Sequence, residues 1–372
     1  MPVSTNRKKN RRARVLRRRL IVACAALLLL GAIIFAIVAL VRSCKTSGSK
    51  RSLPFTASSA YCYTGDGFLC TGERTLDFYS IADESKNFST DTGVSGAHAA
   101  GTDRIKVLYD ASSVQIVGTP YEHTFEGVIR KVVCGGKYVG VYVENADNTH
   151  SLSVFNSAGD RCYKADIGST VLLDFGFEGG ASSAMYTCEL AVSGSAVSTT
   201  LTTYDLARES ITGVMNIRGE VVKNVFITGK SVFVFATDSF IRFERASNTE
   251  AYRMLVRGYD CEDFCAADGR AYLLVRKSAD EGEPARVIEV REGEANETVL
   301  NLAADADASR IFVMGGKVVA LKGDRLIVRD ISGEVKAELP LGTPPDDAVK
   351  LDDGNILLIK DGQTMLYSLK NL

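Results

Sequence analysis

The sequence is poor in the residues and motifs from which many catalytic sites are built. It contains only three histidines, His98, His123 and His150, and none has a paired spacing to a cysteine, which argues against a zinc site. No Gly-x-Ser-x-Gly elbow occurs, and no phosphate loop or Gly-x-Gly-x-x-Gly motif follows a strand. We therefore predict no catalytic residues, no cofactor and no metal, and we favour a protein that is not an enzyme.

Acidic residues are absent from residues 1–51, which hold 13 Lys or Arg side chains. The rest of the chain holds 31 basic and 45 acidic side chains, a net charge of -14, although the whole chain has a net charge of only -1. This asymmetry excludes an ordinary cytosolic enzyme and a nucleic-acid binder with a basic main body. We expect no nucleic-acid partner.

One long uncharged run, residues 20–41, follows the basic segment. A helix of this length covers about 33 Å, enough for a hydrocarbon core of about 30 Å. Nine Lys or Arg side chains precede the run and four follow it closely, so the positive-inside bias predicts a cytoplasmic tail over residues 1–19. We expect residues 42–52 to be a juxtamembrane linker in a single-pass plasma-membrane protein, with residues 53–372 outside the cytoplasm.

Two other interpretations of the uncharged run fit the sequence less well. A cleaved signal peptide has an apolar region of only about 7–15 residues and ends at a small-residue cleavage site, and neither property fits here. A bacterial lipoprotein box would place the lipid on Cys44, but Arg42 departs from that pattern. An uncleaved membrane anchor therefore accounts best for this segment. The basic residues that precede it orient it in the membrane.

Beyond the linker, short apolar and β-branched runs alternate with turns that contain Gly and Asp. One unit recurs, which consists of a strand, a tight turn with glycine, and a second, more apolar strand. It reads VVCGGKYVGVYV at residues 132–143, VFITGKSVFVFA at 225–236 and IFVMGGKVVALK at 311–322. Gly-Gly and Asp-Gly supply the positive φ angles that two-residue hairpin loops need.

The spacing of these turns predicts the fold class. From Gly67 to Gly354 the repeat averages about 41 residues, which is typical of four-stranded propeller blades. We predict an all-β protein, a β-propeller of about eight four-stranded blades, preceded by one transmembrane α-helix. The last unit has only three strands, and residues 53–56 (LPFT) would supply its fourth. Seven blades remain an alternative if the degenerate fourth unit, near residues 176–180, is an insertion.

The repeat resembles the PQQ-like and WD40-like propeller superfamily, and the whole layout resembles membrane-anchored bacterial propeller proteins of unassigned function. The chain contains no tryptophan, so it has neither a Trp-Asp repeat signature nor the docking tryptophans of quinoprotein blades. The resemblance therefore implies a propeller fold and does not imply quinone-dependent dehydrogenase chemistry.

Two predictions concern particular side chains. Cys62 and Cys70 flank a short turn, and outside the cytoplasm they could form a hairpin disulfide. The connections between second and third strands vary in length, and such loops often carry recognition groups. The polar residues that we expect in a binding face are Asn145, Asp147, His150, Asp280, Glu281 and Glu283.

The function that we favour is an interaction platform, a scaffold or sensor with a protein partner or ligand in the cell envelope. An extracytoplasmic hydrolase that acts on glycans or peptides is the alternative, and a signal transducer that uses the 19-residue tail is a third interpretation. Paired carboxylates at the central channel would favour the hydrolase, and a broad apolar or aromatic patch would favour the platform.

Overall fold

The computed structural model divides the chain into two compact units, residues 1–47 with 371 and residues 48–370 with 372. The predicted cytoplasmic tail (1–19) and transmembrane segment (20–41) lie outside the described residues. Within the described part of the chain, no helix is long and apolar enough to cross a membrane. The described residues are 47–92, 96–168, 170–180, 182–278, 283–292, 297–370 and 372.

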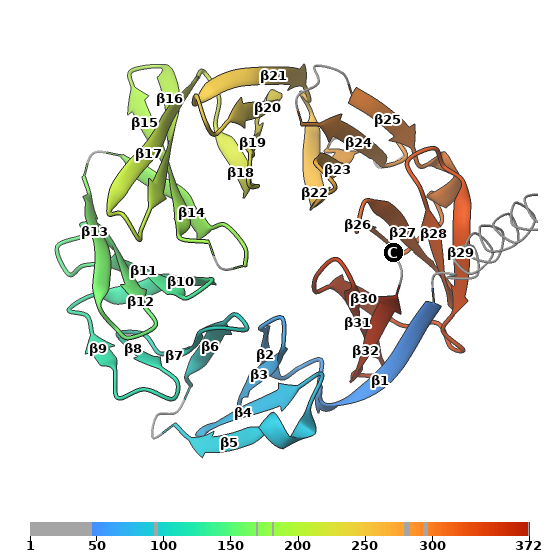
Figure 1. The fold of residues 1–372 in the computed structure, drawn as a ribbon, viewed down its shortest axis with the longest axis horizontal. Helices are drawn as coiled ribbons and strands as arrows, with labels where there is room; N and C mark the ends of the chain where they lie inside the picture. The colour runs from blue at the N-terminus through green and yellow to red at the C-terminus, as the bar shows by residue number, and fades with distance from the viewer. Residues whose placement is uncertain are drawn as a thin grey trace, which may run out of the picture. The chain divides into compact units, whose positions relative to one another are not determined.

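The second unit consists of eight four-stranded sheets arranged in a ring, which confirms the predicted all-β propeller and its eight blades (Figure 1). Blades 1 to 3 comprise β2 (Ala60–Tyr63), β3 (Gly67–Thr71), β4 (Thr75–Ser80) and β5 (Phe88–Asp91); β6 (His98–Gly101), β7 (Lys106–Tyr109), β8 (Ser113–Ile116) and β9 (Glu122–Thr124); and β10 (Val128–Gly135), β11 (Tyr138–Glu144), β12 (His150–Asn156) and β13 (Arg161–Ile167). Blades 4 and 5 comprise β14 (Val171–Phe177), β15 (Ala184–Ser193), β16 (Ala196–Asp205) and β17 (Ser210–Arg218); and β18 (Val222–Ile227), β19 (Ser231–Ala236), β20 (Ser239–Glu244) and β21 (Thr249–Leu255).

Blades 6 to 8 follow the same antiparallel order. They comprise β22 (Tyr259–Ala267), β23 (Arg270–Lys277), β24 (Arg286–Arg291) and β25 (Glu297–Asn301); β26 (Arg310–Met314), β27 (Lys317–Lys322), β28 (Arg325–Arg329) and β29 (Val335–Pro340); and β30 (Asp347–Lys350), β31 (Asn355–Lys360), β32 (Gln363–Lys370) and β1 (Ser47–Thr56). Two short 3-10 helices lie outside the sheets, η1 (Glu84–Lys86) and η2 (Ala303–Asp305).

Strand β1 closes the ring, because it pairs with β32 as the outermost strand of blade 8. Residues 53–56 therefore supply the missing fourth strand, as the sequence predicts. The strand begins at Ser47, so residues 47–52, which we expected in the linker, belong to the sheet. The Ala57 N–H continues the closure by donating to the Gly362 carbonyl at 2.9 Å.

The core lies between neighbouring blades rather than inside any one of them. A middle strand such as β19 is buried along its whole length, because both of its faces pack against other blades. Phe233, Phe235 and Phe240 are fully buried in the cluster between blades 5 and 6. Outer strands such as β17 instead alternate between exposed and buried residues, because only one of their faces is covered.

The degenerate fourth unit is a complete blade. Its second and third strands, β15 and β16, have ten residues each. Residues 178–183 connect β14 to β15 in place of the tight turn found in the other units. This longer connection weakened the repeat signal in the sequence without interrupting the sheet.

Candidate functional site: a hollow in the channel wall

The innermost strand of each blade pairs with another strand along one edge only, and its other edge is turned toward the axis of the ring (Figure 1). The space around this axis is called the central channel below. Charged side chains on these strands join neighbouring blades. Three pairs lie at the interfaces of blades 3 and 4, 5 and 6, and 7 and 8: Lys131–Asp174 at 2.6 Å, Lys223–Asp260 at 2.5 Å and Arg310–Asp347 at 2.7 Å. These pairs are partly exposed, so each adds modest stability and mainly orients the inner strands.

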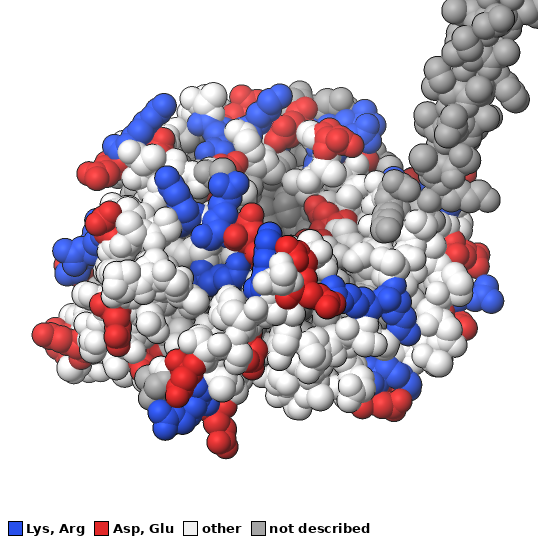
Figure 2. Space-filling view, turned by 60° about the horizontal axis from the view of Figure 1, so that its bottom comes forward, with Lys and Arg blue, Asp and Glu red and all other residues white. Residues whose placement is uncertain are grey.

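A hollow of about 970 Å³ opens in the channel wall, where β22, β26 and β30 of blades 6, 7 and 8 meet. Its lining combines apolar side chains, among them Phe264, Ile311 and Val349, with the charged side chains Glu262 and Lys350. Figure 2 shows Lys, Arg, Asp and Glu side chains interleaved around the hollowed centre of one face of the propeller. Apolar walls with a few polar groups are typical of ligand sites.

Asp263 and Lys350 form a buried pair beside this hollow, with Nζ and Oδ1 2.9 Å apart. The pair satisfies the channel-facing main chain of two strands. The Asp263 carboxylate accepts the N–H groups of Phe264 and Val313, each at 2.8 Å. The Lys350 ammonium donates to the carbonyls of the same two residues, at 2.9 and 2.6 Å. One ion pair therefore takes the place of a neighbouring strand for both β22 and β26.

Burial sets the electrostatics of this pair. The side chains of Lys350 and Asp263 are only 16% and 17% exposed. Burial raises the pKa of the Asp263 carboxyl, and the positive charge of Lys350 and the hydrogen bonds that Asp263 accepts oppose that rise. A pair this buried is costly to break, because either partner alone would be an uncompensated charge in a poorly solvated site.

Two further ion pairs flank the hollow. The Arg276 guanidinium donates to both carboxylate oxygens of Glu262, at 2.5 and 3.4 Å. Arg310 donates to both carboxylate oxygens of Asp347 and holds the pKa of that carboxyl below its usual range. The carboxylates that line the hollow, Glu262 and Asp263, are thus both paired with cations. They can orient polar groups of a ligand, but neither is a free general base.

An apolar part of the channel wall and a charged part meet at Phe264. A second hollow of about 460 Å³ runs along the inner strands of blades 3 to 6. Its lining is mostly apolar and aromatic. Phe226 and Phe264 stack there in parallel, with ring centroids 3.9 Å apart and an interplanar angle of 6°. Because Phe264 lines both hollows, one side chain separates an apolar wall from a charged one.

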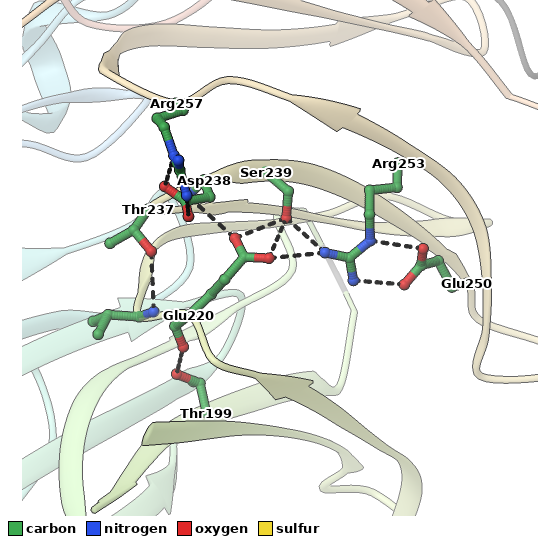
Figure 3. Close-up of polar contacts among 9 residues, drawn as sticks. Thr199, Glu220, Thr237, Asp238, Ser239, Glu250, Arg253 and Arg257 are labelled. Carbon is green, nitrogen blue, oxygen red and sulfur yellow. Dashed lines mark hydrogen bonds and ion pairs between the residues drawn. The ribbon is translucent and has the colours of Figure 1, made fainter. Parts of the chain in front are cut away.

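A second polar network holds blades 4 and 5 together (Figure 3). Glu220, in the connection between β17 and β18, accepts hydrogen bonds from the Ser239 hydroxyl at 2.9 Å and the Asp238 N–H at 3.1 Å. Arg253 donates to Glu220 at 2.8 Å and reaches both carboxylate oxygens of Glu250. Each of these groups has its partner inside the network, so we assign it a role in rigidity.

The same network reaches both neighbouring sheets. The Thr199 hydroxyl on β16 donates to the Glu220 carbonyl at 2.8 Å, and Arg257 donates to both carboxylate oxygens of Asp238 (Figure 3). Side chains from β16, from the β19–β20 turn and from β21 and the residues that follow it therefore meet at one connection. This interlock limits relative movement of the two blades.

The loop residues predicted from sequence fall on two blades that are not neighbours. Asn145 and Asp147 lie in the connection between β11 and β12, where both hydrogen-bond to Thr149 and close the turn. His150 begins β12, and its ring stacks on that of Tyr142 at 5.4 Å. These groups belong to blade 3, and their role in binding stays a prediction.

The other predicted loop residues belong to blade 6. Glu283 accepts a hydrogen bond from Lys277 at 3.1 Å, and Arg286 and Tyr259 also donate to it, at 3.5 and 3.4 Å. Asp280 and Glu281 lie outside the described residues. The structure therefore does not bring the two predicted loops together, since blades 4 and 5 separate them in the ring (Figure 1).

The predicted disulfide between Cys62 and Cys70 is absent, because the strand register separates the two side chains. Cys70 lies opposite Tyr61, and Cys62 lies opposite Leu69, so the two thiols are on opposite faces of the hairpin. Both are free cysteines. Among the residues that the structure describes, no three His, Cys, Asp or Glu side chains are grouped so that they could hold a metal ion.

Sequence reasoning missed the residues of the hollow. Lys350 is a charged residue between Val349 and Leu351 on an innermost strand, and this was the only local signal. Asp263 follows another acidic residue, Glu262, so nothing in the local sequence distinguishes it. The separation of 87 residues between Asp263 and Lys350 hides the pairing. The sequence placed both strands at the inner edge of a blade without showing which blades would meet.

Comparison with known proteins supports the fold. No family model and no curated protein matches the chain. Three similar solved structures each have a TM-score of 0.53. BamB from Moraxella catarrhalis is 8% identical, and the match covers 88% of this chain and 98% of BamB. The computationally designed Ika8 protein is 13% identical, with 86% of this chain and 100% of Ika8 covered, and the WD40 domain of SCAP from fission yeast is 7% identical, with 87% and 98% covered. At these identities the likeness shows the fold alone, which agrees with the predicted propeller.

Proposed function

We propose that this chain is a single-pass membrane protein whose propeller acts as an interaction platform in the cell envelope. The observation that carries the proposal is the hollow of about 970 Å³ between blades 6, 7 and 8. It presents apolar and charged groups on strands that are fixed by pairing and by interblade contacts. A site that is already ordered binds with a smaller loss of conformational entropy.

Membrane anchoring rests on the sequence. Residues 20–41 carry no charge, and the nine basic side chains before them favour a cytoplasmic N-terminus. The propeller would then lie outside the cytoplasm. Protease added to intact cells should degrade residues 48–370 and spare a tag at the N-terminus. Protection of the propeller in intact cells, with loss of protection after permeabilisation, would overturn this orientation.

The arrangement of charges favours a platform over a hydrolase. A glycosidase needs one carboxylic acid and one free carboxylate across the scissile bond. At the hollow, Glu262 and Asp263 are each paired with a cation, Arg276 and Lys350 respectively. Paired charges of this kind suit the recognition of polar groups on a ligand.

Site-specific photo-crosslinking tests the platform. A benzophenone amino acid at Val349, which lines the hollow and is 38% exposed, should capture a discrete adduct when the full chain is in its native membrane. The matched control is the same amino acid at Val335, which is 41% exposed on the outer strand β29. The same adducts at both positions, or none at either, would count against the hollow as the contact site.

The predicted loops on blades 3 and 6 would add contacts to the platform. Six substitutions to alanine test this part of the proposal in the photo-crosslinking assay at Val349. If the adduct forms at the same yield in the sixfold variant, the loops have no role in partner capture. The residues replaced together are Asn145, Asp147, His150, Asp280, Glu281 and Glu283.

A further inference from the structure

We propose that the hollow binds an extended polypeptide segment, which pairs with the channel-facing edge of β26 at Ile311. This inference rests on the proposed function and names the ligand class of the same site. It follows from the main chain of β26, from the Asp263–Lys350 pair next to it, and from the side chains on either side of the strand.

The register of β26 shows which main-chain groups face the channel. Val313 directs its N–H to Asp263 and its carbonyl to Lys350, so these groups point away from β27. Along a strand in an antiparallel pair, main-chain groups alternate between the two edges. The register of β26 and β27 has no shift, so Ile311, two residues before Val313, also directs its N–H and carbonyl to the channel.

The two positions differ in how their main-chain groups are satisfied. At Val313 the ion pair supplies an acceptor and a donor, as a neighbouring strand would. At Ile311, which lines the hollow, no described residue supplies either one. The hollow therefore begins next to the point where the Asp263–Lys350 pair stops satisfying the main chain of β26. An added strand is the ligand whose donors and acceptors match this edge.

The walls on either side indicate the side chains of the segment. Neighbouring residues of an added strand would point alternately toward blade 6 and blade 8. The wall on blade 6 carries the Glu262–Arg276 ion pair. The face of blade 8 that is turned toward blade 7 carries Ala348 and Lys350, and Arg310 of β26 pairs with Asp347 on that side. We infer a segment of a partner protein that carries charged residues on both faces, toward blade 6 and toward blade 8.

A library of random heptapeptides displayed on phage is the probe. Selection against the full chain in detergent should enrich peptides that carry charged residues at neighbouring positions, and so on both faces of the added strand. Hydrogen exchange with a selected synthetic peptide should slow within residues 310–314. Ile311→Pro should weaken binding by roughly tenfold, since it removes the channel-facing donor and spares the hydrogen bonds to β27.

Two controls separate binding from folding. Ile311→Val keeps the N–H and should bind normally. Ile227 is also a partly buried residue on an innermost strand, in blade 5, so Ile227→Pro reports what a proline costs away from the hollow. Equal weakening by both proline variants, or slowed exchange outside residues 310–314, would overturn the assignment. So would the failure of any peptide to be enriched, while an adduct at Val349 but not at Val335 would still support the platform with another ligand class.

Discussion

Lys350 on β30 and Asp263 on β22 are joined by a hydrogen bond of 2.9 Å, although blade 7 lies between their blades. The pair also binds Val313 of blade 7, so three consecutive blades meet at one ammonium and one carboxylate. Lys350 belongs to blade 8, which β1 completes. The contact therefore links the closing blade to the two blades before it.

Replacing Lys350 by methionine should destabilise the propeller by about 3–5 kcal/mol, because a buried carboxylate loses its partner. Chemical denaturation monitored by tyrosine fluorescence measures the loss. The control is Lys164→Met, which removes a partly exposed ammonium 3.2 Å from Asp166 and should change stability by about 0–1 kcal/mol. Similar effects of the two changes would mean that the Lys350 contact is not buried in solution.

Glu220→Gln should cost about 1–3 kcal/mol of unfolding free energy, since one oxygen that accepts hydrogen bonds becomes an N–H₂ donor. In the variant, the new side-chain N–H₂ group would face another donor, either the Arg253 guanidinium or the Asp238 N–H. Glu250→Gln alters only the partly exposed pairing with Arg253, so its expected cost is below about 1 kcal/mol. Urea unfolding of the two variants distinguishes these outcomes, and the reverse order of costs would contradict the network.

Closure of the ring by β1 predicts a large effect of Phe55→Ala. Phe55 is 6% exposed, and its ring lies 5.1 Å from that of Phe68 and 5.2 Å from that of Tyr61. Truncation should cost about 3–5 kcal/mol. Val335→Ala, on the exposed outer strand of blade 7, should stay within about 0.5 kcal/mol. A small effect of the phenylalanine change would show that β1 is not needed for closure.

Protonation of Asp330 should account for part of the loss of folding stability in acid. Burial opposes ionisation, but hydrogen bonds from Ser332, Lys336 and the Glu334 N–H lower the pKa of Asp330 to about 2. A lowered pKa in the folded state contributes stability above the unfolded pKa of 3.8, and this contribution is lost as the pH falls toward 2.

Asp330→Asn should therefore reduce the dependence of unfolding free energy on pH between about 4 and 2. Asparagine retains an oxygen for the turn and does not titrate, so any loss that does not depend on pH is measured separately near neutrality. An unchanged slope in the acid range would argue that Asp330 has an ordinary pKa.

Thiol labelling tests the hairpin register in blade 1. Burial raises the pKa of Cys70 to about 12, so its reaction with maleimide should be slow in the folded protein at neutral pH. After denaturation without reductant, Cys62 and Cys70 should both be alkylated. Recovery of a crosslinked peptide that contains the two residues would contradict the register in which Cys70 faces Tyr61.

Local patterns predicted the blades well because each hairpin depends on a short stretch of sequence. Gly136, Gly269 and Gly316 all adopt positive φ at the expected turns. The pairing of Cys62 with Leu69 was not predictable in the same way. A shift of one residue moves every side chain to the other face, and turn composition alone does not determine that shift.

The amino-acid sequence by itself determined the four-stranded repeat unit, the antiparallel order within each blade and the use of an N-terminal strand for closure. All three follow from turn residues and from apolar periodicity within about 40 residues. Only the tertiary structure decided that Asp263 meets Lys350 and that Glu220 meets Arg253. Such contacts join residues from different strands and blades, so they depend on how whole sheets pack and not on the local pattern.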